Sequence, residues 1–288
     1  MTVVILHNPR SGSGQAQTNA DAAAKTLKNA NIPITRRTIG SDPSLDANAL
    51  ENARALIVVG GDGTVLRAAP PAIQANCPLY HLPTGNENLF ARAFNMTSDP
   101  QAILRAVEKN QTTRAAVATL ETNETTTDFL LMASLGPDAG VITRLANIRN
   151  RPTGHRAYTR PILAEIFKPT LPHLTIKADN QPLVQNRQGW VIIANARQYA
   201  LRLDPVQSAD ITKPRLDLVF MPAATSLGSA LALLRARHRP KSFTYAQATS
   251  IKITTDSPTP CQIDGESSPP TSNLTITTKP ETLPILLP

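Results

Sequence analysis

The sequence contains few cysteines. Cys77 and Cys261 are the only ones among 288 residues, and they lie far apart in the chain. Two distant cysteines do not provide the disulfide framework of a small secreted domain. We therefore expect two free thiols in a reducing compartment, with one long-range disulfide as the alternative. The five histidines do not cluster at the spacing of zinc ligands, so we expect no zinc site.

Long apolar runs are also absent from the sequence. No stretch reaches the roughly 18 consecutive apolar residues that a membrane-spanning helix requires. The N-terminus enters an apolar run at residues 2–6, without the charged start and small-residue cleavage site of a signal peptide. We therefore expect a cytoplasmic protein that can attach to a membrane peripherally.

Acidic residues are outnumbered by basic ones. The chain has 21 Asp and Glu against 29 Lys and Arg, which gives a formal net charge of +8. This excess favours an anionic partner, such as a phosphorylated small molecule, an acidic membrane surface or a nucleic acid. We do not expect nucleic acid, because aromatic residues, 4% of the chain, are not interleaved with the basic ones.

Two stretches concentrate the positive charge. Residues 139–164 contain no acidic residue, and residues 235–241 read Arg-Ala-Arg-His-Arg-Pro-Lys. The arginines of the first stretch are Arg144, Arg149, Arg151, Arg156 and Arg160. We expect one of the two stretches to face anionic lipid headgroups, and a solvated basic face without a specific partner is the alternative.

Apolar runs alternate with helical patterns in the first part of the chain. Patterns typical of strands occupy residues 3–6, 34–39, 55–59 and 79–82. An alanine-rich helix is expected at residues 15–29 and a short helix at 45–53. Another helix should start after Thr64 and end or kink at Pro70 and Pro71. Strands separated by helices predict a parallel α/β sheet.

The composition changes near residue 118. Beyond it, short runs of threonine, valine and isoleucine are separated by proline, asparagine and aspartate. This pattern predicts a mainly antiparallel, β-rich domain at residues 119–279, with short strands that include 251–255 and 274–277. Helical patterns interrupt it at residues 139–148, 157–167 and 226–237. The sequence thus predicts an α/β domain at residues 1–118 followed by a β-rich domain.

Two glycine-rich loops follow the first and third predicted strands, at residues 11–14 and 60–64. Ligands of α/β sheets bind beyond the carboxyl ends of the strands, where glycine amides and helix N-termini attract phosphate. In the second loop, Thr64 can donate a hydroxyl, and Asp62 can hold Mg²⁺ or orient a nucleophile. Tight turns without a ligand are the alternative, which is weaker for the second loop because a buried strand leads into it.

Four short motifs occur along the chain. They are HNPRSGSGQA at residues 7–16, GGDGT at 60–64, LPTGNENLFARAF at 82–94 and QIDGES at 262–267. GGDGT resembles the signature shared by diacylglycerol kinases, sphingosine kinases, bacterial lipid kinases and NAD kinases. The other three are similar to motifs of the lipid kinase branch and occur in its order. The chain thus resembles the diacylglycerol kinase catalytic-domain family over nearly its whole length.

This resemblance implies a nucleotide-binding α/β domain, a β-rich lipid-substrate domain and a C-terminal tail, residues 280–288, that returns to the first domain. ATP with Mg²⁺ would phosphorylate a lipid hydroxyl between the two domains. The residues implied to bind the nucleotide are Asn8, Ser11, Gly12, Thr38, Gly60, Gly61, Asp62, Gly63, Thr64, Val65, Leu66, Gly85, Asn86 and Asn88. The resemblance does not identify the metal ligands.

The resemblance also implies two catalytic acids, Asp62 and Glu266. Glu266 would accept the proton of the attacking hydroxyl and Asp62 would support the Mg²⁺–phosphate geometry, although which of the two is the base stays open. Without the other motifs, Asp264, Gly265 and Glu266 would be interpreted as a simple hairpin turn with solvated acids.

Several positions depart from the family pattern. Asn86 stands where threonine is usual and Leu89 where aspartate is frequent, although Asn86 can still bond a phosphate or a ribose. In the segment 204–217, Lys213 and Pro214 replace the Asp-Gly pair of a loop that often binds a structural Mg²⁺. Because a lysine cannot ligate Mg²⁺, we expect this structural metal site to be missing.

Two other functions stay open. NAD kinase is favoured by GGDGT together with Val65, Leu66 and Arg67, but not by the other three motifs. A nucleotide- or lipid-binding protein without turnover is favoured by the departures, whereas the retention of Asp62 and Glu266 favours catalysis. The lipid acceptor and the oligomeric state, monomer or homodimer, also stay open.

Overall fold

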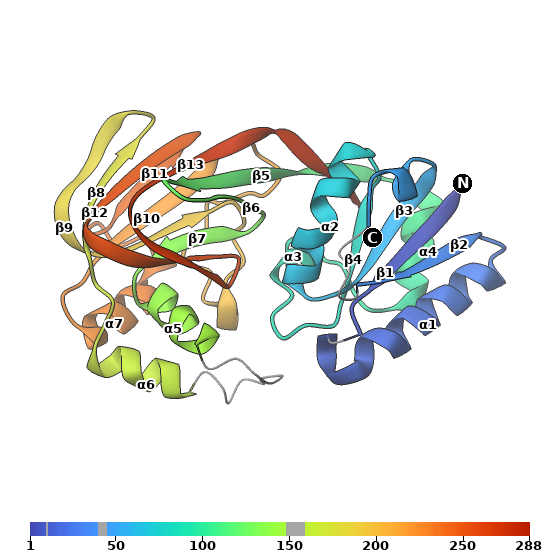
Figure 1. Cartoon of the computed structure of the whole chain (residues 1–288), viewed down its shortest axis with the longest axis horizontal. Helices are drawn as coiled ribbons and strands as arrows, with labels where there is room; N and C mark the ends of the chain where they lie inside the picture. The colour runs from blue at the N-terminus through green and yellow to red at the C-terminus, as the bar shows by residue number, and fades with distance from the viewer. Residues whose placement is uncertain (10, 40–44, 148–158) are drawn as a thin grey trace. The chain divides into compact units, whose positions relative to one another are not determined.

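The computed structural model describes residues 1–9, 11–39, 45–147 and 159–288 (Figure 1). Within these ranges the chain forms two compact units, Met1–Ala115 together with Glu281–Pro288, and Ala116–Pro280. No helix in the described ranges is long and apolar enough to cross a membrane. Three arginines of the first basic stretch, Arg149, Arg151 and Arg156, lie outside the described residues.

A parallel sheet forms the centre of the first unit. Its strands β1 (Thr2–His7), β2 (Ile34–Thr38), β3 (Ala53–Gly60) and β4 (Leu79–Pro83) lie in the order β4-β3-β1-β2. The end of β13 (Glu266–Leu286) pairs in parallel with β4 through Ile285 and Leu79. β1 and β3 are buried along most of their length, as strands covered on both faces are. The prediction of parallel strands is confirmed.

Helices connect these strands. They are α1 (Gln15–Asn29), α2 (Asp62–Gln74), α3 (Leu89–Ala93) and α4 (Pro100–Lys109). The bounds of α1 agree with the predicted helix. The buried side chains of α1 are Ala16, Ala20, Ala23, Ala24 and Leu27, which share one face because they recur every three or four residues.

Helix α2 differs from the predicted helix. It begins at Asp62, before Thr64, and it continues through Pro70 and Pro71 to its end at Gln74. The two prolines remove backbone donors, but alanines on both sides of them are buried and anchor the helix. The prediction that the helix starts after Thr64 was therefore wrong, and so was an end at the prolines.

The short helix predicted at residues 45–53 is also wrong. A 3-10 turn forms at Asn48–Leu50, and β3 has already begun at Ala53. Leu50 is the buried residue of this turn. A single apolar anchor cannot hold a longer helix in place, since most helix stability in proteins comes from packing of an apolar face.

Antiparallel strands dominate the second unit. After β5 (Thr112–Thr122), which leads into it, the chain forms β6 (Thr126–Phe129), β7 (Met132–Leu135), β8 (His173–Ala178), β9 (Gln181–Ala194), β10 (Leu216–Pro222), β11 (Thr244–Ala248), β12 (Ser250–Ile263) and β13. β9 pairs with β7, β8 and β10, and β12 pairs with β7, β8 and β13, always antiparallel. Their inward side chains, including Phe129, Ile193 and Phe220, form one apolar core. The prediction of mainly antiparallel strands is confirmed.

Three helical segments predicted in this region are present. They are α5 (Pro137–Ala146), α6 (Thr159–Phe167) and α7 (Ser226–Ala236), each within a few residues of its predicted bounds. Figure 1 shows these helices grouped together on one side of the second unit.

The hairpin of β12 and β13 is longer than predicted. The short runs at residues 251–255 and 274–277 belong to strands of 14 and 21 residues. Irregularities in the register between Thr254 and Cys261 coincide with Pro258 and Pro260. Proline breaks the alternating pattern in the sequence, yet it is tolerated in a strand at such irregular positions. The full length of the hairpin was therefore not predicted.

Candidate functional site

Three loops lie at the carboxyl ends of the parallel strands in the first unit. The Asn8 loop (residues 8, 9 and 11–14) follows β1, the Gly60 loop (residues 60–64) joins β3 to α2, and the Thr84 loop (residues 84–88) follows β4. The backbone N–H of Asn8 donates to the carbonyl of Val59 at 3.0 Å, and that of Thr84 donates to the carbonyl of Gly60 at 2.9 Å. The loops therefore lie side by side, with the Gly60 loop in the middle.

Glycines allow these loops to approach one another closely. A Cβ atom on Gly12 would lie 2.4 Å from the carbonyl oxygen of Thr84, and one on Gly85 would lie 2.9 Å from the Cα of Gly61. Gly12 also has a φ of 62°, a left-handed conformation that residues with a side chain rarely adopt. The hydroxyl groups of Ser11 and Thr84 lie 3.0 Å apart and form a hydrogen bond between the outer loops. A larger residue at Gly12 or Gly85 would push the loops apart.

Asp62 joins the Gly60 loop to the helix that follows the Thr84 loop. One carboxylate oxygen accepts a hydrogen bond from the N–H of Leu89 and the other from the N–H of Phe90, both at 2.9 Å. These are the first N–H groups of α3, which have no acceptor within their own helix. A negative charge at a helix N-terminus is stabilising, so Asp62 caps α3. The sequence did not predict this structural role.

Asn88 holds the shape of the Thr84 loop. Its side-chain oxygen accepts from the N–H of Gly85 at 2.8 Å, and its NH₂ group donates to the carbonyl of Gly85 at 2.7 Å. Its φ of 49° is left-handed, a conformation in which asparagine is enriched. The loop is therefore closed by its own side chain before α3 begins at Leu89.

His81, in β4, is buried against the Gly60 loop. Its Nε2 lies 2.9 Å from the carbonyl oxygen of Gly60 and carries the proton of that hydrogen bond. Burial lowers the pKa of His81, which favours the neutral ring. Because the carbonyl of Gly60 accepts from His81 and Thr84 in a trans peptide, the N–H of Gly61 points away from them. His81 thus orients the first peptide of the Gly60 loop.

The loops leave open space next to their helix N-termini. A Cβ atom on Gly63, in the first turn of α2, or on Gly14, which precedes α1, would meet no neighbouring atom within 4 Å. Gly63 and Gly14 are both exposed. Bare amides at a helix N-terminus bind anions such as phosphate. The residues present therefore fit a phosphate-containing ligand.

The remaining predicted nucleotide contacts have different surroundings. Thr38 ends β2, is exposed and places its hydroxyl 3.5 Å from Nε2 of His7. Asn86 is exposed in the Thr84 loop. Val65 is fully buried, so its side chain belongs to the core, and Leu66 is partly buried. The structure brings together at one edge Asn8, Ser11, Gly12, Gly60, Gly61, Asp62, Thr64, Gly85 and Asn88.

In the second unit, Asp264 and Gly265 form the turn between β12 and β13. Both have positive φ, 48° and 82°, and Ile263 pairs with Glu266 across the turn. Positive φ at both central residues is typical of the tight hairpin turns that favour Asp-Gly. The interpretation as a hairpin turn is thus confirmed for the backbone. Glu266 is exposed at the start of β13.

Asp264 is not a solvated acid, however. Its carboxylate accepts hydrogen bonds from the N–H groups of Leu130, Leu131 and Met132, at 2.8 to 2.9 Å. These donors lie where β6 ends and β7 begins. Asp264 therefore fixes the turn, and with it the base of Glu266, to the neighbouring strands. The alternative interpretation, a hairpin turn with solvated acids, is wrong for this residue.

A polar cluster beside this turn was not predicted. Asp138, at the start of α5, accepts hydrogen bonds from the hydroxyls of Ser134 at 2.5 Å and Tyr199 at 2.9 Å. Gln262 donates to Ser134 at 3.0 Å and accepts from the N–H of Gly265 at 2.9 Å. Burial raises the pKa of Asp138, although its hydrogen bonds act in the opposite direction. The cluster connects α5 to the Asp264 turn.

Two acidic side chains in the segment at residues 204–217, Asp204 and Asp210, form local hydrogen bonds. Asp204 accepts from the N–H of Tyr199 at 2.8 Å, and Asp210 accepts from the hydroxyl of Thr212 at 2.7 Å. Among the described residues, no group of three His, Cys, Asp or Glu side chains could hold a metal ion. The missing structural Mg²⁺ site stays a prediction.

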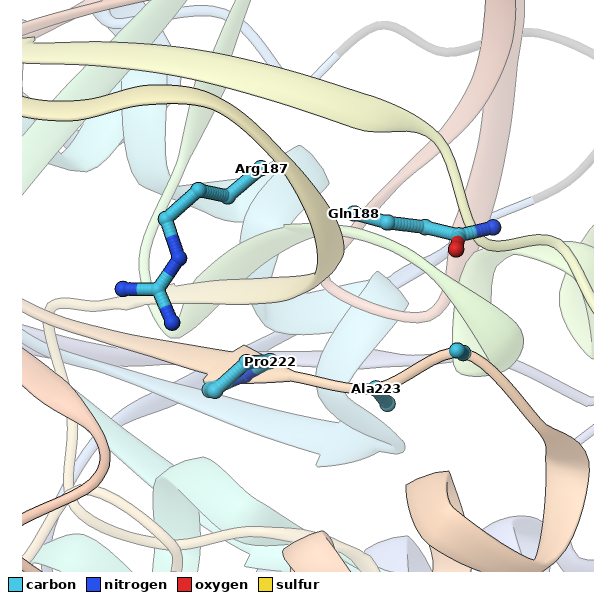
Figure 2. Close-up of a pocket in the computed structure, with 5 residues that line it drawn as sticks. Arg187, Gln188, Pro222 and Ala223 are labelled. Carbon is cyan, nitrogen blue, oxygen red and sulfur yellow. The ribbon is translucent and has the colours of Figure 1, made fainter.

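A surface pocket of about 370 Å³ lies elsewhere in the second unit. It is lined by Arg187, Gln188, Pro222, Ala223 and Ala224, and Figure 2 shows the side chain of Arg187 extending toward Pro222. The guanidinium group of Arg187 lies 5.6 Å from the centre of the Phe220 ring. None of the motif residues lines this pocket, so we do not assign the phosphate chemistry to it.

Comparisons with known proteins agree with the motifs. Residues 2–120 match the family model for the diacylglycerol kinase catalytic domain. A diacylglycerol kinase of Mycobacterium tuberculosis (strain ATCC 25618 / H37Rv) is 30% identical over 173 residues, and the same holds for the protein of strain CDC 1551 / Oshkosh. The match covers 58% of this chain and 55% of each relative, so it spans about half the length of these curated proteins.

Solved structures share the fold. A putative diacylglycerol kinase from Bacillus anthracis str. Sterne superposes with a TM-score of 0.74 at 18% identity, over 100% of this chain and 95% of that one. An NAD kinase from Archaeoglobus fulgidus in complex with ATP gives a TM-score of 0.55 at 15% identity, over 99% and 93%. The mixed α/β fold is thus the one shared by these kinases. The resemblance of this chain to the diacylglycerol kinase catalytic-domain family, predicted from its ordered motifs, is confirmed.

Proposed function

We propose that this chain is an ATP-dependent lipid kinase that phosphorylates a hydroxyl of diacylglycerol or a related lipid. The observation that carries the proposal is the junction of three loops at one sheet edge, two of which Asp62 connects, in a segment that matches the diacylglycerol kinase catalytic domain. The ATP bound in the structurally similar NAD kinase supports the choice of nucleotide.

The amides of the Gly60 loop would bind the nucleotide phosphates. The N–H groups at the start of α2 belong to Asp62 and Gly63, and the positive end of the helix dipole adds to their attraction for anions. When bound, ATP would supply the phosphoryl group and Mg²⁺ would neutralise the charge on its oxygens. The close packing at Gly12, Gly61 and Gly85 would hold the three loops close together around the phosphates.

Asp62 would act mainly as a positioning residue. Both of its oxygens already accept backbone hydrogen bonds from α3, which fixes the Thr84 loop relative to the Gly60 loop. Each oxygen retains a further lone pair, so the same carboxylate can contribute to holding Mg²⁺.

Glu266 would act as the general base. It is exposed and follows a turn that Asp264 ties to three backbone N–H groups, so the backbone that carries it is held in place. In phosphoryl transfer, such a carboxylate accepts the proton of the attacking hydroxyl. The proposal requires Glu266 to reach the lipid hydroxyl at the nucleotide phosphates.

The direct test is transfer of labelled phosphate from ATP to a fractionated lipid panel, with NAD as a separate acceptor. We expect a labelled lipid and no labelled NADP. The variant Glu266→Gln should lose transfer by at least about a hundredfold, the usual contribution of a general base. Glu124→Gln, an exposed glutamate at another turn of the second unit, is the matched control and should retain full activity.

Two results would contradict the proposed activity, and a third would contradict only the assignment of the base. Labelling of NAD instead of lipid would assign the chain to NAD kinase activity. ATP binding without transfer to any lipid would indicate a binding protein. Full activity of Glu266→Gln would refute the assignment of the base while leaving the kinase activity itself intact.

A further inference from the structure

Exposed large apolar side chains are concentrated on two helices. In the part of the chain that the structure describes, nine such side chains are exposed, four of them on α6 and three on α7. The remaining two are Met1 and Leu201. Scattered apolar residues on a surface are ordinary, but a concentration on adjacent elements marks an interaction surface.

Helix α6 turns its apolar side outward. Its exposed residues are Ile162, Leu163, Ile166 and Phe167, and Phe167 is 86% exposed. The buried charged residue of the same helix is Glu165, which accepts from Nε of Arg144 at 2.9 Å and from the N–H of Thr170. Gly140 of α5 packs against the carboxylate, where a Cβ would come within 2.5 Å. The ion pair between buried Glu165 and partly exposed Arg144 therefore helps to fix the helix with its apolar side facing solvent.

Helix α7 has the same inverted arrangement. Leu227, Leu231 and Leu234 are exposed and recur at intervals of four and three residues, which places them on one stripe. The side of α7 that packs on the unit carries the small residues Ser229, Ala232 and Ala236. A helix whose only role was to cover the core would bury its leucines instead.

The two stripes are adjacent. The hydroxyl of Ser226, the first residue of α7, donates to the carbonyl of Ile166 and lies 3.4 Å from that of Glu165, near the end of α6. Figure 1 shows α6 and α7 beside each other in the second unit. We call the seven exposed side chains on these helices the α6–α7 apolar surface.

Positive charge accompanies this surface. Arg160 and Lys168 lie within and directly after α6, and Arg235 and Arg237 lie at the end of α7. No acidic residue occurs between positions 218 and 255 in the sequence. Glu165, the acid of α6, is buried and paired with Arg144. Among the described residues, the exposed charged side chains on and directly after these two helices are thus all positive.

We propose that the α6–α7 apolar surface docks on an anionic lipid bilayer. The apolar side chains would enter the interface between headgroups and acyl chains, and the basic residues would contact the headgroups. An anionic bilayer matches both features at once. A second copy of the chain matches less well, because two such surfaces face to face would bring arginines and lysines together. The inference concerns membrane binding and does not depend on phosphoryl transfer.

The test is sedimentation of the full chain with vesicles of phosphatidylglycerol mixed with phosphatidylcholine, compared with phosphatidylcholine alone. We expect binding to the anionic vesicles and at least about tenfold weaker binding to the neutral ones. The double variant Phe167→Ser, Leu227→Ser should bind anionic vesicles at least about tenfold more weakly, because each large side chain contributes on the order of a factor of ten.

Two variants with the same change in net charge distinguish the effect of the basic residues at α7 on vesicle binding from the effect of the overall charge. Arg235→Glu, Arg237→Glu should weaken binding by at least about tenfold. Lys25→Glu, Lys28→Glu changes the net charge equally, on exposed positions of α1 in the first unit, and should change binding much less. All four sites are exposed, so the midpoint of thermal unfolding should change little and serves as the control for folding.

Several outcomes would overturn the proposal. One is unchanged vesicle binding by the Phe167→Ser, Leu227→Ser variant. A second is an equal loss in the charge-matched variants, which would indicate a general charge effect. A third is a lipid-free dimer that dissociates in the serine variant, which would assign the surface to a second copy. If the wild-type chain binds the vesicles but shows no kinase activity, only the proposed function is contradicted.

Discussion

Replacing Asp62 with alanine would leave the N–H groups of Leu89 and Phe90 without their carboxylate acceptor. Hydrogen bonds to a charged group contribute about 1.5 to 3 kcal/mol each. The site is partly exposed, so water can replace some of the lost bonding, and we expect the free energy of unfolding to fall by about 3 kcal/mol in total. Asp62→Asn keeps one acceptor oxygen and should lose about half as much.

The matched control is Asp99→Ala. Asp99 caps α4 in a similar way, by accepting from the N–H groups of Gln101 at 2.9 Å and Ala102 at 3.2 Å, but it lies outside the three loops. Its loss should cost about 1 kcal/mol, the usual value for an N-cap. Urea denaturation measures stability, and calorimetric titration with MgATP measures nucleotide affinity.

The two aspartates should differ in function. Asp62→Ala should lower both stability and nucleotide affinity, because it releases the Thr84 loop, whereas Asp99→Ala should lower stability alone. Equal nucleotide affinity in Asp62→Ala and the wild type would refute the reasoning that Asp62 organises the loops.

Three further predictions follow from single contacts. Gly85→Ala would place a Cβ 2.9 Å from the Cα of Gly61 and should lower the free energy of unfolding, measured by urea denaturation, by about 1 to 3 kcal/mol. Unchanged stability would contradict the close packing of the two loops. Because burial lowers the pKa of His81, the folded state binds fewer protons than the unfolded one below about pH 6.5, and stability should fall as the pH decreases through that range. His81→Gln should reduce this pH dependence, and an unchanged profile would contradict it. Mn²⁺ should not broaden the amide resonances near Asp210, and broadening there would reveal a metal site in the 204–217 segment.

Local sequence patterns were sufficient to predict elements whose own residues show the spacing of a helix or a strand. The alanines of α1 recur with helical spacing between a glycine-rich loop and Pro33, and the helix has the predicted bounds. The start of α2 was missed because Gly-Asp-Gly is a poor helix former in isolation. The first residue of its first turn, Asp62, is held by hydrogen bonds to a different helix, which begins 27 residues further along the chain.

The candidate site shows the same division. Parallel strands place their following loops at one edge, so the association of the glycine motifs in the first unit was predictable. The hydrogen-bond partners of the acidic residues were not predictable. Asp264 bonds to backbone groups more than 130 residues away, and Gln262 connects the turn to Ser134. Such contacts depend on the register of β7 against β12, which no local pattern specifies.

The measurement that tests the central claim most directly is an amide NMR titration with MgATP. The account predicts that the resonances of Gly61, Asp62, Gly63 and Gly85 shift together and saturate with one affinity, because the proposed site has the first three amides around the phosphates and Gly85 packed against Gly61. Gly189, which lies in β9 of the second unit, serves as an internal reference and should not shift. Saturable shifts confined to residues outside the three loops, or no shifts at all, would contradict the claim that this sheet edge binds the nucleotide.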